Sequence, residues 1–171
     1  KVSNWQSNHT KYGEAVIASL RAVILYLYRL KENQPHRAQS RLQKIKISIM
    51  NYLLIGAGSC IGGMLRFGLS QWIQTKTGAV FPYGTLGVNL LGCFLIGLVF
   101  GWSERTAIPQ EWRLFLTTGL LGGFTTFSAF SNETVGMLRS GWYTGAALYV
   151  LGSVLPGIGA TFGGYWAAKA G

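Results

Sequence analysis

The residues best suited to binding an ion lie in segment 119–133, which reads GLLGGFTTFSAFSNE. Two adjacent glycines followed by two β-branched threonines form a poor continuous helix, which predicts a break at Gly122 and Gly123. Carbonyls released at such a break can coordinate a cation, and free amides and hydroxyls can bind an anion. Phe127 and Phe130 are three residues apart and share nearly one helical face. Their electropositive edges can face an anion, although packing against lipid or protein is the commoner explanation for such rings.

Two polar side chains interrupt other apolar segments, where their burial is costly. Asn89 lies in GTLGVNLLG (84–92), and its amide can donate to an anion or bond a neighbouring helix. Arg66 ends GGMLR (62–66), and it can attract anions at a pore entrance or reach towards lipid headgroups. These residues therefore predict either an ion pathway or contacts that assemble the helices.

Enzyme chemistry has little support in residues 50–171. This part contains no histidine, which removes the usual nucleophile–base pairs and histidine metal sites. Its carboxylates are Glu104, Glu111 and Glu133, and its two cysteines, Cys60 and Cys93, lack metal-ligand spacing. We therefore expect that the protein is not an enzyme.

The elements that must position these residues are long and apolar. Only 12% of the 171 residues are charged, about half the usual fraction for a soluble domain. A helix needs about 20 mostly apolar residues to cross a bilayer, and tryptophans favour its ends. The sequence thus predicts an all-α membrane protein with four transmembrane helices and a break in the third. The expected spans are 52–73, 83–102, 114–138 and 142–168.

Glycines spaced four apart predict close packing of these helices, within a bundle or between subunits. The basic residues beside the spans are nearly balanced, with three on one side of the membrane and two on the other. Such balance permits insertion in both orientations, although the basic N-terminal segment offers another way to fix orientation. The glycine pairs are Gly58 and Gly62, Gly97 and Gly101, Gly119 and Gly123, and Gly159 and Gly163.

Most of the net charge of +10 belongs to residues 1–49, which hold nine Lys and Arg against two acidic residues. A charge concentrated there does not indicate a nucleic-acid partner for the apolar part. We interpret 1–49 as a basic extension, which could form an interfacial amphipathic helix. The alternative is a misassigned start, with Met50 as the true first residue. Residues 50–171 form the predicted four-helix domain.

Three motifs in order resemble one known family. Residues 122–133 resemble the third-helix signature of the Fluc fluoride channels, also called CrcB proteins. Residues 84–92 resemble their second-helix motif, and residues 62–66 resemble their first-helix motif. The resemblance covers residues 50–171, while 1–49 have no counterpart in it.

This resemblance implies an antiparallel, dual-topology homodimer in the cell inner membrane, with two fluoride pathways. It also implies a structural Na⁺ at the dimer interface, held by the backbone carbonyls of Gly122 and Thr125. Arg66 is expected near the pore entrance. The implied fluoride pathway comprises Asn89, Phe127, Ser128, Phe130, Glu133, Tyr149 and Ser153.

The implied function is passive, fluoride-selective export from the cytoplasm, which limits fluoride toxicity. The expected partners are fluoride, a second copy of the chain and the lipid bilayer, with no nucleic acid. An alternative is a small dual-topology multidrug or cation transporter, which would need a carboxylate in the first span, where this chain has Arg66. A structural membrane subunit is a third possibility, but it leaves Asn89 and the predicted break without a role.

Overall fold

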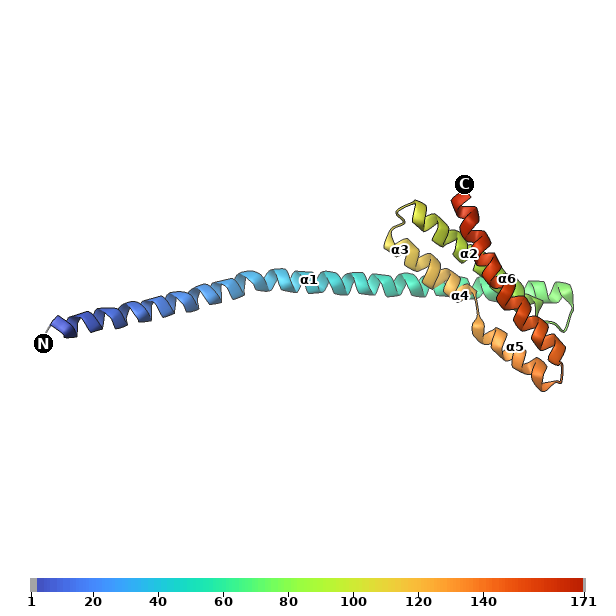
Figure 1. Ribbon diagram of the computed structural model, residues 1–171, viewed down its shortest axis with the longest axis horizontal. Helices are drawn as coiled ribbons and strands as arrows, with labels where there is room; N and C mark the ends of the chain where they lie inside the picture. The colour runs from blue at the N-terminus through green and yellow to red at the C-terminus, as the bar shows by residue number, and fades with distance from the viewer. Residues whose placement is uncertain (1–2, 171) are drawn as a thin grey trace. The chain divides into compact units, whose positions relative to one another are not determined.

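The computed structural model describes the backbone of residues 3–170 and the side chains of residues 18, 21–29 and 38–170. Every regular element in this described part is a helix (Figure 1). In chain order the elements are α1 (Ser3–Thr77), α2 (Tyr83–Arg105), α3 (Gln110–Arg113), η1 (Leu114–Leu121), α4 (Gly122–Phe124), α5 (Phe127–Arg139) and α6 (Tyr143–Ala170).

The chain divides into two compact units, Lys1–Ser48 and Ile49–Gly171. The described part of the first unit is helical, and its described side chains are exposed. The second unit contains the C-terminal part of α1 and all later elements. Every predicted site residue lies in this second unit, whereas the role of residues 1–49 stays a prediction.

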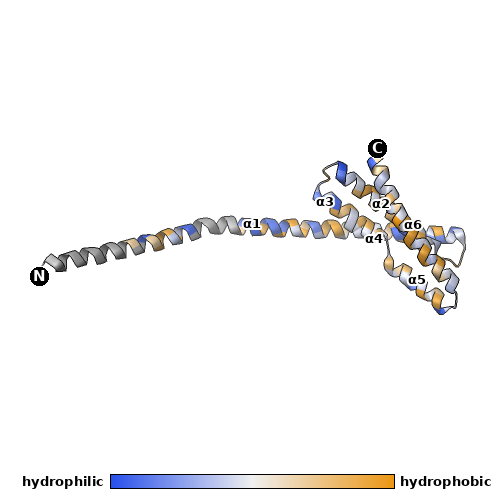
Figure 2. Ribbon diagram, viewed as in Figure 1, coloured by the Kyte–Doolittle hydropathy of each residue, from blue (hydrophilic) through white to orange (hydrophobic). Residues whose placement is uncertain are grey.

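Four helical segments are long and apolar enough to cross a membrane, as the sequence predicts. Figure 2 shows hydrophobic residues along α2 and α6, with hydrophilic residues gathered near their ends. Many large apolar side chains of these helices are exposed, which is expected where lipid is the solvent. The candidate spans are Ala38–Thr77, Tyr83–Arg105, Gln110–Arg139 and Tyr143–Ala170.

The third span is broken, but the break lies slightly later than the glycine pair suggests. Gly122 and Gly123 remain helical in α4, and the extended residues are Thr125 (φ −88°, ψ 156°) and Thr126 (φ −147°, ψ 116°). The preceding segment η1 is an eight-residue π-helix, a rare form that occurs frequently at functional sites. The prediction of a broken third helix is therefore confirmed, and its position is corrected.

Glycines allow α2 and α6 to pack with their backbones nearly in contact. A Cβ atom on Gly97 would clash with the Thr161 carbonyl oxygen, and one on Gly164 would clash with the Phe94 carbonyl oxygen. Small residues serve this purpose in membranes because apolar surface gains little by leaving lipid. The same close approach joins α1 to the third span, where a Cβ on Gly58 would lie 2.7 Å from the Phe115 carbonyl oxygen.

The fourth glycine pair makes no contact within the chain, so packing of this pair against a second subunit stays a prediction. A Cβ on Gly159 or Gly163 would meet no described atom within 4 Å, other than its chain neighbours and its own helix backbone. Gly164, one residue later, makes the contact with α2 instead. The helical register explains this difference, since adjacent residues on a helix project about 100° apart. The Gly159 and Gly163 face is left open in the single chain.

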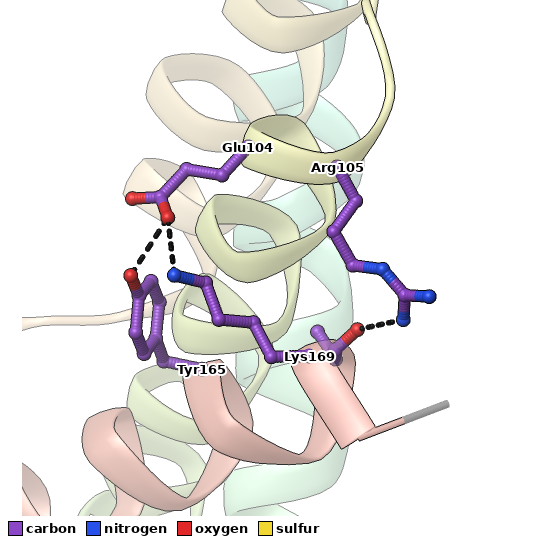
Figure 3. A network of polar contacts seen from close by, with 5 residues as sticks. Glu104, Arg105, Tyr165 and Lys169 are labelled. Atoms are coloured by element: carbon purple, nitrogen blue, oxygen red, sulfur yellow. Dashed lines mark hydrogen bonds and ion pairs between the residues drawn. The ribbon is translucent and has the colours of Figure 1, made fainter.

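Polar contacts join the C-terminal ends of α2 and α6 (Figure 3). Glu104 Oε2 lies 2.7 Å from Lys169 Nζ and accepts a hydrogen bond of 2.7 Å from the Tyr165 hydroxyl. Arg105 Nη1 donates to the Ala168 carbonyl oxygen at 2.9 Å, which satisfies one of the last carbonyls of α6. Charged groups at both helix ends suit a position at the membrane–water interface.

Candidate functional site

The break in the third span is held by Asn89 of α2. Asn89 Nδ2 donates to the Thr126 carbonyl oxygen at 3.0 Å, and the Thr126 N–H donates to Asn89 Oδ1 at 2.8 Å. The side-chain amide thus pairs with both backbone groups of one extended residue, as a neighbouring strand would. Gly92, one turn later on α2, leaves the space that the Thr125 side chain occupies. Asn89 therefore bonds another helix, and it keeps one amide N–H beyond the bond to Thr126.

The break also removes the helical donors of the Gly122 and Thr125 carbonyls. In a continuous helix the Gly122 carbonyl would accept from the Thr126 N–H, which here donates to Asn89. The Thr125 carbonyl would accept from the Ala129 N–H, which instead donates to the Thr126 hydroxyl at 3.2 Å. The two carbonyls expected to hold a cation are among those that lose their helical donor at the break.

These carbonyls fit a hard cation better than any side-chain cluster does. Within the described residues, no group of three or more His, Cys, Asp or Glu side chains could hold a metal ion. Hard cations such as Na⁺ prefer oxygen ligands, and unwound backbone in membrane proteins supplies them. Two carbonyl oxygens from one chain are few for such an ion, so a complete site would need further ligands, such as those of a second copy.

Phe127 and Phe130 occupy the first turn of α5, and their ring centroids are 5.6 Å apart at an interplanar angle of 45°. Their surroundings differ. Phe130 is 9% exposed and packs against Tyr149 of α6 at a centroid distance of 5.1 Å, whereas Phe127 is 77% exposed. The pair therefore connects a buried aromatic contact to an open face of the chain.

Glu133 joins three helices through its carboxylate. Its Oε1 accepts from the Thr85 hydroxyl of α2 at 2.6 Å, and its Oε2 accepts from the Tyr149 hydroxyl of α6 at 2.6 Å. Tyr149 is fully buried and Thr85 is 6% exposed. Sequence reasoning did not select Thr85 as a site residue. Its signal was a hydroxyl four residues before Asn89, on the same face of an apolar helix.

Arg66 and Glu133 face one cavity of about 190 Å³. Arg66 is partly buried, and its Nε donates to the Gly123 carbonyl oxygen at 3.3 Å. The arginine is thus attached to the broken helix. The cavity contains polar groups from α1, α2 and the third span. Its lining residues are Arg66, Phe67, Ser70, Gln71, Thr85, Val88, Thr126, Ala129 and Glu133.

The side chains of Ser128 and Ser153 differ in their exposure. The Ser128 side chain is exposed, and its hydroxyl lies 3.2 Å from the Thr126 hydroxyl. The Ser153 hydroxyl oxygen is buried and has no hydrogen-bond partner among the described residues. Ser153 lies one turn beyond Tyr149 on α6. The structure therefore brings Glu133, Phe130 and Tyr149 together and attaches Asn89 to Thr126, just before α5, while Ser128 and Phe127 lie on the open face.

Comparison with known proteins agrees with this architecture. The family model described as CrcB-like protein, Camphor Resistance (CrcB), matches residues 53–165. The chain is 47% identical over 119 residues to a fluoride-specific ion channel FluC of Thermus thermophilus, covering 70% of this chain and 94% of that protein. It is 48% identical over 111 residues to FluC of Methylobacterium nodulans, covering 64% of this chain and 89% of that protein. It is 44% identical over 113 residues to FluC of Oceanobacillus iheyensis, covering 66% and 86%.

The matched region contains the broken third span and the Glu133 contacts. It also contains the two hydrogen bonds between Asn89 and Thr126, which we call the Asn89 clamp. The features of the site and the similarity therefore coincide. With four candidate spans and a family match over 113 of its 171 residues, the chain belongs to the CrcB family of membrane proteins.

Proposed function

We propose that this chain is a fluoride-specific ion channel that lets fluoride leave the cytoplasm passively. The observation that carries this proposal is the 47% identity to a channel of that name, over 94% of the channel's length. Fluoride enters cells as the neutral acid and ionises inside, so an open exit for the anion lowers its concentration there. The chain is a multi-pass membrane protein, and we assign it to the cell inner membrane.

The conduction pathway follows Phe130 and Tyr149, with Asn89 beside them. Fluoride is strongly hydrated, so a pore must replace its water with hydrogen-bond donors while binding it only moderately. Asn89 retains one N–H for this purpose, and the Ser153 hydroxyl has no partner among the described residues. The edges of Phe127 and Phe130 add weak positive potential without a fixed charge.

The remaining predicted residues line the approaches to this narrow part. Arg66 attracts the anion into the 190 Å³ cavity. Glu133 orients the Tyr149 hydroxyl by accepting a hydrogen bond from it. Ser128 lies on the open face beside Phe127 and supplies a further hydroxyl. No lysine or arginine lies between residues 77 and 104, which avoids a charge that would trap the anion in the second span.

The working unit is an antiparallel, dual-topology homodimer. Three features support a second copy: the 77% exposure of Phe127, the open Gly159 and Gly163 face, and a cation site with too few ligands in one chain. Near-balanced flanking charge supports both orientations. The flanking residues are Arg105, Arg113 and Lys169 on one side, and Lys76 and Arg139 on the other.

A structural Na⁺ lies between the two copies in this proposal, held by the carbonyls of Gly122 and Thr125 from each. When bound, the ion supplies a positive charge that fixes four carbonyl dipoles together. The chain's own contribution is two hydrogen bonds that divert the helical donors of these carbonyls: the Thr126 N–H donates to Asn89, and the Ala129 N–H donates to the Thr126 hydroxyl.

A test in cells uses a bacterial strain that lacks its own fluoride export. At acidic external pH, cells producing this chain should survive fluoride that kills cells carrying the empty vector. A correctly inserted chain that gives no protection would contradict the proposal. The cation-transporter alternative is not favoured, because its expected first-span carboxylate is replaced by Arg66 and the relatives are named as fluoride channels.

A further inference from the structure

The side-chain amide of Gln74, in the last turn of α1, binds the loop between α1 and α2 at three points. Gln74 Nε2 donates to the carbonyl oxygens of Ala79 and Phe81 at 2.6 and 3.1 Å. Gln74 Oε1 accepts from the Gly84 N–H at 3.1 Å. This contact uses both amide N–H donors. One side chain thus fixes the whole turn from Ala79 to the start of α2.

The fixed turn presents Phe81 to the aromatic cluster around Tyr149. The Phe81 ring meets the Tyr149 ring edge to face at a centroid distance of 5.4 Å, and it meets Trp142 at 6.2 Å. Tyr149 in turn packs on Phe130 at 5.1 Å. Phe81 therefore supports Tyr149 by a contact separate from that of Phe130.

The same amide sets the position of Thr85. Gly84, whose N–H it binds, lies against the Ser70 backbone so closely that a Cβ would clash with the Ser70 carbonyl oxygen. The next residue, Thr85, donates to Glu133 Oε1 at 2.6 Å, while Tyr149 donates to Glu133 Oε2 at 2.6 Å. Phe81 and Thr85 thus hold the Glu133–Tyr149 pair through both of its members.

We infer that Gln74 is a positioning residue for conduction: it fixes Phe81 and Thr85, which orient the Glu133–Tyr149 pair beside Phe130. This inference rests on the proposed pathway through Phe130 and Tyr149. Gln74 itself acts from outside that pathway, through the loop. Without its amide, the Ala79 and Phe81 carbonyls lose this donor, the turn gains freedom, and the Tyr149 hydroxyl is held less often in its bond to Glu133.

The test compares full-length variants in liposomes. Gln74→Leu keeps a similar side-chain size but removes all three hydrogen bonds. The matched control is Thr75→Val. It removes a hydroxyl on the same turn that donates to the Gln71 carbonyl of its own helix, 2.8 Å away.

Fluoride flux is measured per folded channel, and the fluoride-to-chloride selectivity is measured alongside it. Because each lost hydrogen bond shifts a local equilibrium by about fivefold, Gln74→Leu should lower flux per folded channel at least about fivefold. Thr75→Val should conduct as wild type does.

A double-mutant cycle separates positioning from simple loss of folding. Tyr149→Phe removes the hydroxyl that the loop helps to orient, so Gln74→Leu should lower flux much less in that background than in wild type. Fully additive effects, unchanged flux in Gln74→Leu, or a loss accounted for by less folded protein would each overturn the inference.

Phe130→Ile distinguishes this inference from the pathway on which it rests. If Phe130→Ile blocks flux while Gln74→Leu conducts normally, the positioning role alone is wrong. If Phe130→Ile conducts normally, or the wild-type chain conducts no fluoride, then the pathway fails and the positioning role fails with it.

Discussion

Replacing Asn89 by leucine should both destabilise the break and stop conduction. Leucine has the same side-chain branching as asparagine, with methyl groups in place of the amide oxygen and nitrogen, so the main loss is polar. The variant removes the 3.0 Å bond to the Thr126 carbonyl and the 2.8 Å bond from the Thr126 N–H. Both backbone groups are partly buried, and each costs about 1–3 kcal/mol when left without a partner.

The two losses together predict that the free energy of unfolding falls by about 2–4 kcal/mol, since partial burial reduces the upper bound. Asn89→Asp should behave differently. Its carboxylate can still accept from the Thr126 N–H, but its second oxygen faces the Thr126 carbonyl without a proton to donate, and its negative charge is costly to bury and repels an anion. Asn132→Leu is the control, because Asn132 is an exposed asparagine of α5.

The assay is denaturant unfolding in detergent, followed by fluoride flux in liposomes for each variant that folds. We expect wild type and Asn132→Leu to be similarly stable and both Asn89 variants to be less stable, with flux lost in both Asn89 variants. A stability change below about 0.5 kcal/mol in Asn89→Leu would refute the clamp. Normal flux in Asn89→Asp would refute the role of the amide N–H.

Three further outcomes are expected. Phe130→Ile should abolish fluoride flux and leave dimer assembly intact by gel filtration, because only the aromatic edge is lost; normal flux would argue against this pathway. Replacing Na⁺ by a bulky organic cation should weaken the dimer or its activity, measured by subunit exchange or flux, and insensitivity to Na⁺ would count against the carbonyl site. Gly164→Ala should separate α2 from α6 and cost about 1–3 kcal/mol, since its Cβ meets the Phe94 carbonyl, whereas Gly163→Ala has open space and should cost much less within the chain. Equal losses of stability in the two glycine variants would contradict the packing.

The four spans could be predicted from the sequence because each exceeds the length that a bilayer requires, and charges mark the turns between them. The break was also predictable, since Gly122 and Gly123 followed by Thr125 and Thr126 make a weak helix. The position of the break was not predictable. The helix propensity of glycine is a local property. Which residue becomes extended is instead determined by Asn89, which lies 37 positions away and forms hydrogen bonds with Thr126.

Partners distant in the chain explain what else could not be decided from the sequence. Thr85 and Gln74 look like ordinary polar residues near helix ends until Glu133 and the Phe81 loop are brought beside them. Gly159 and Gly163 have the spacing of a packing face, but only the relative rotation of α2 and α6 decides that Gly164 makes the contact. Sequence patterns identify elements and residue types; tertiary contacts decide which of them meet.

The most direct test of the central claim is fluoride efflux from liposomes that contain the purified full-length chain. Loaded with potassium fluoride and treated with a potassium ionophore, they should release fluoride rapidly, and liposomes loaded with potassium chloride should retain their chloride. Ionophore dependence of the fluoride release would show that the anion crosses as a charge. Release of no fluoride, or of chloride at a similar rate, would contradict the assignment of this chain as a fluoride-specific channel.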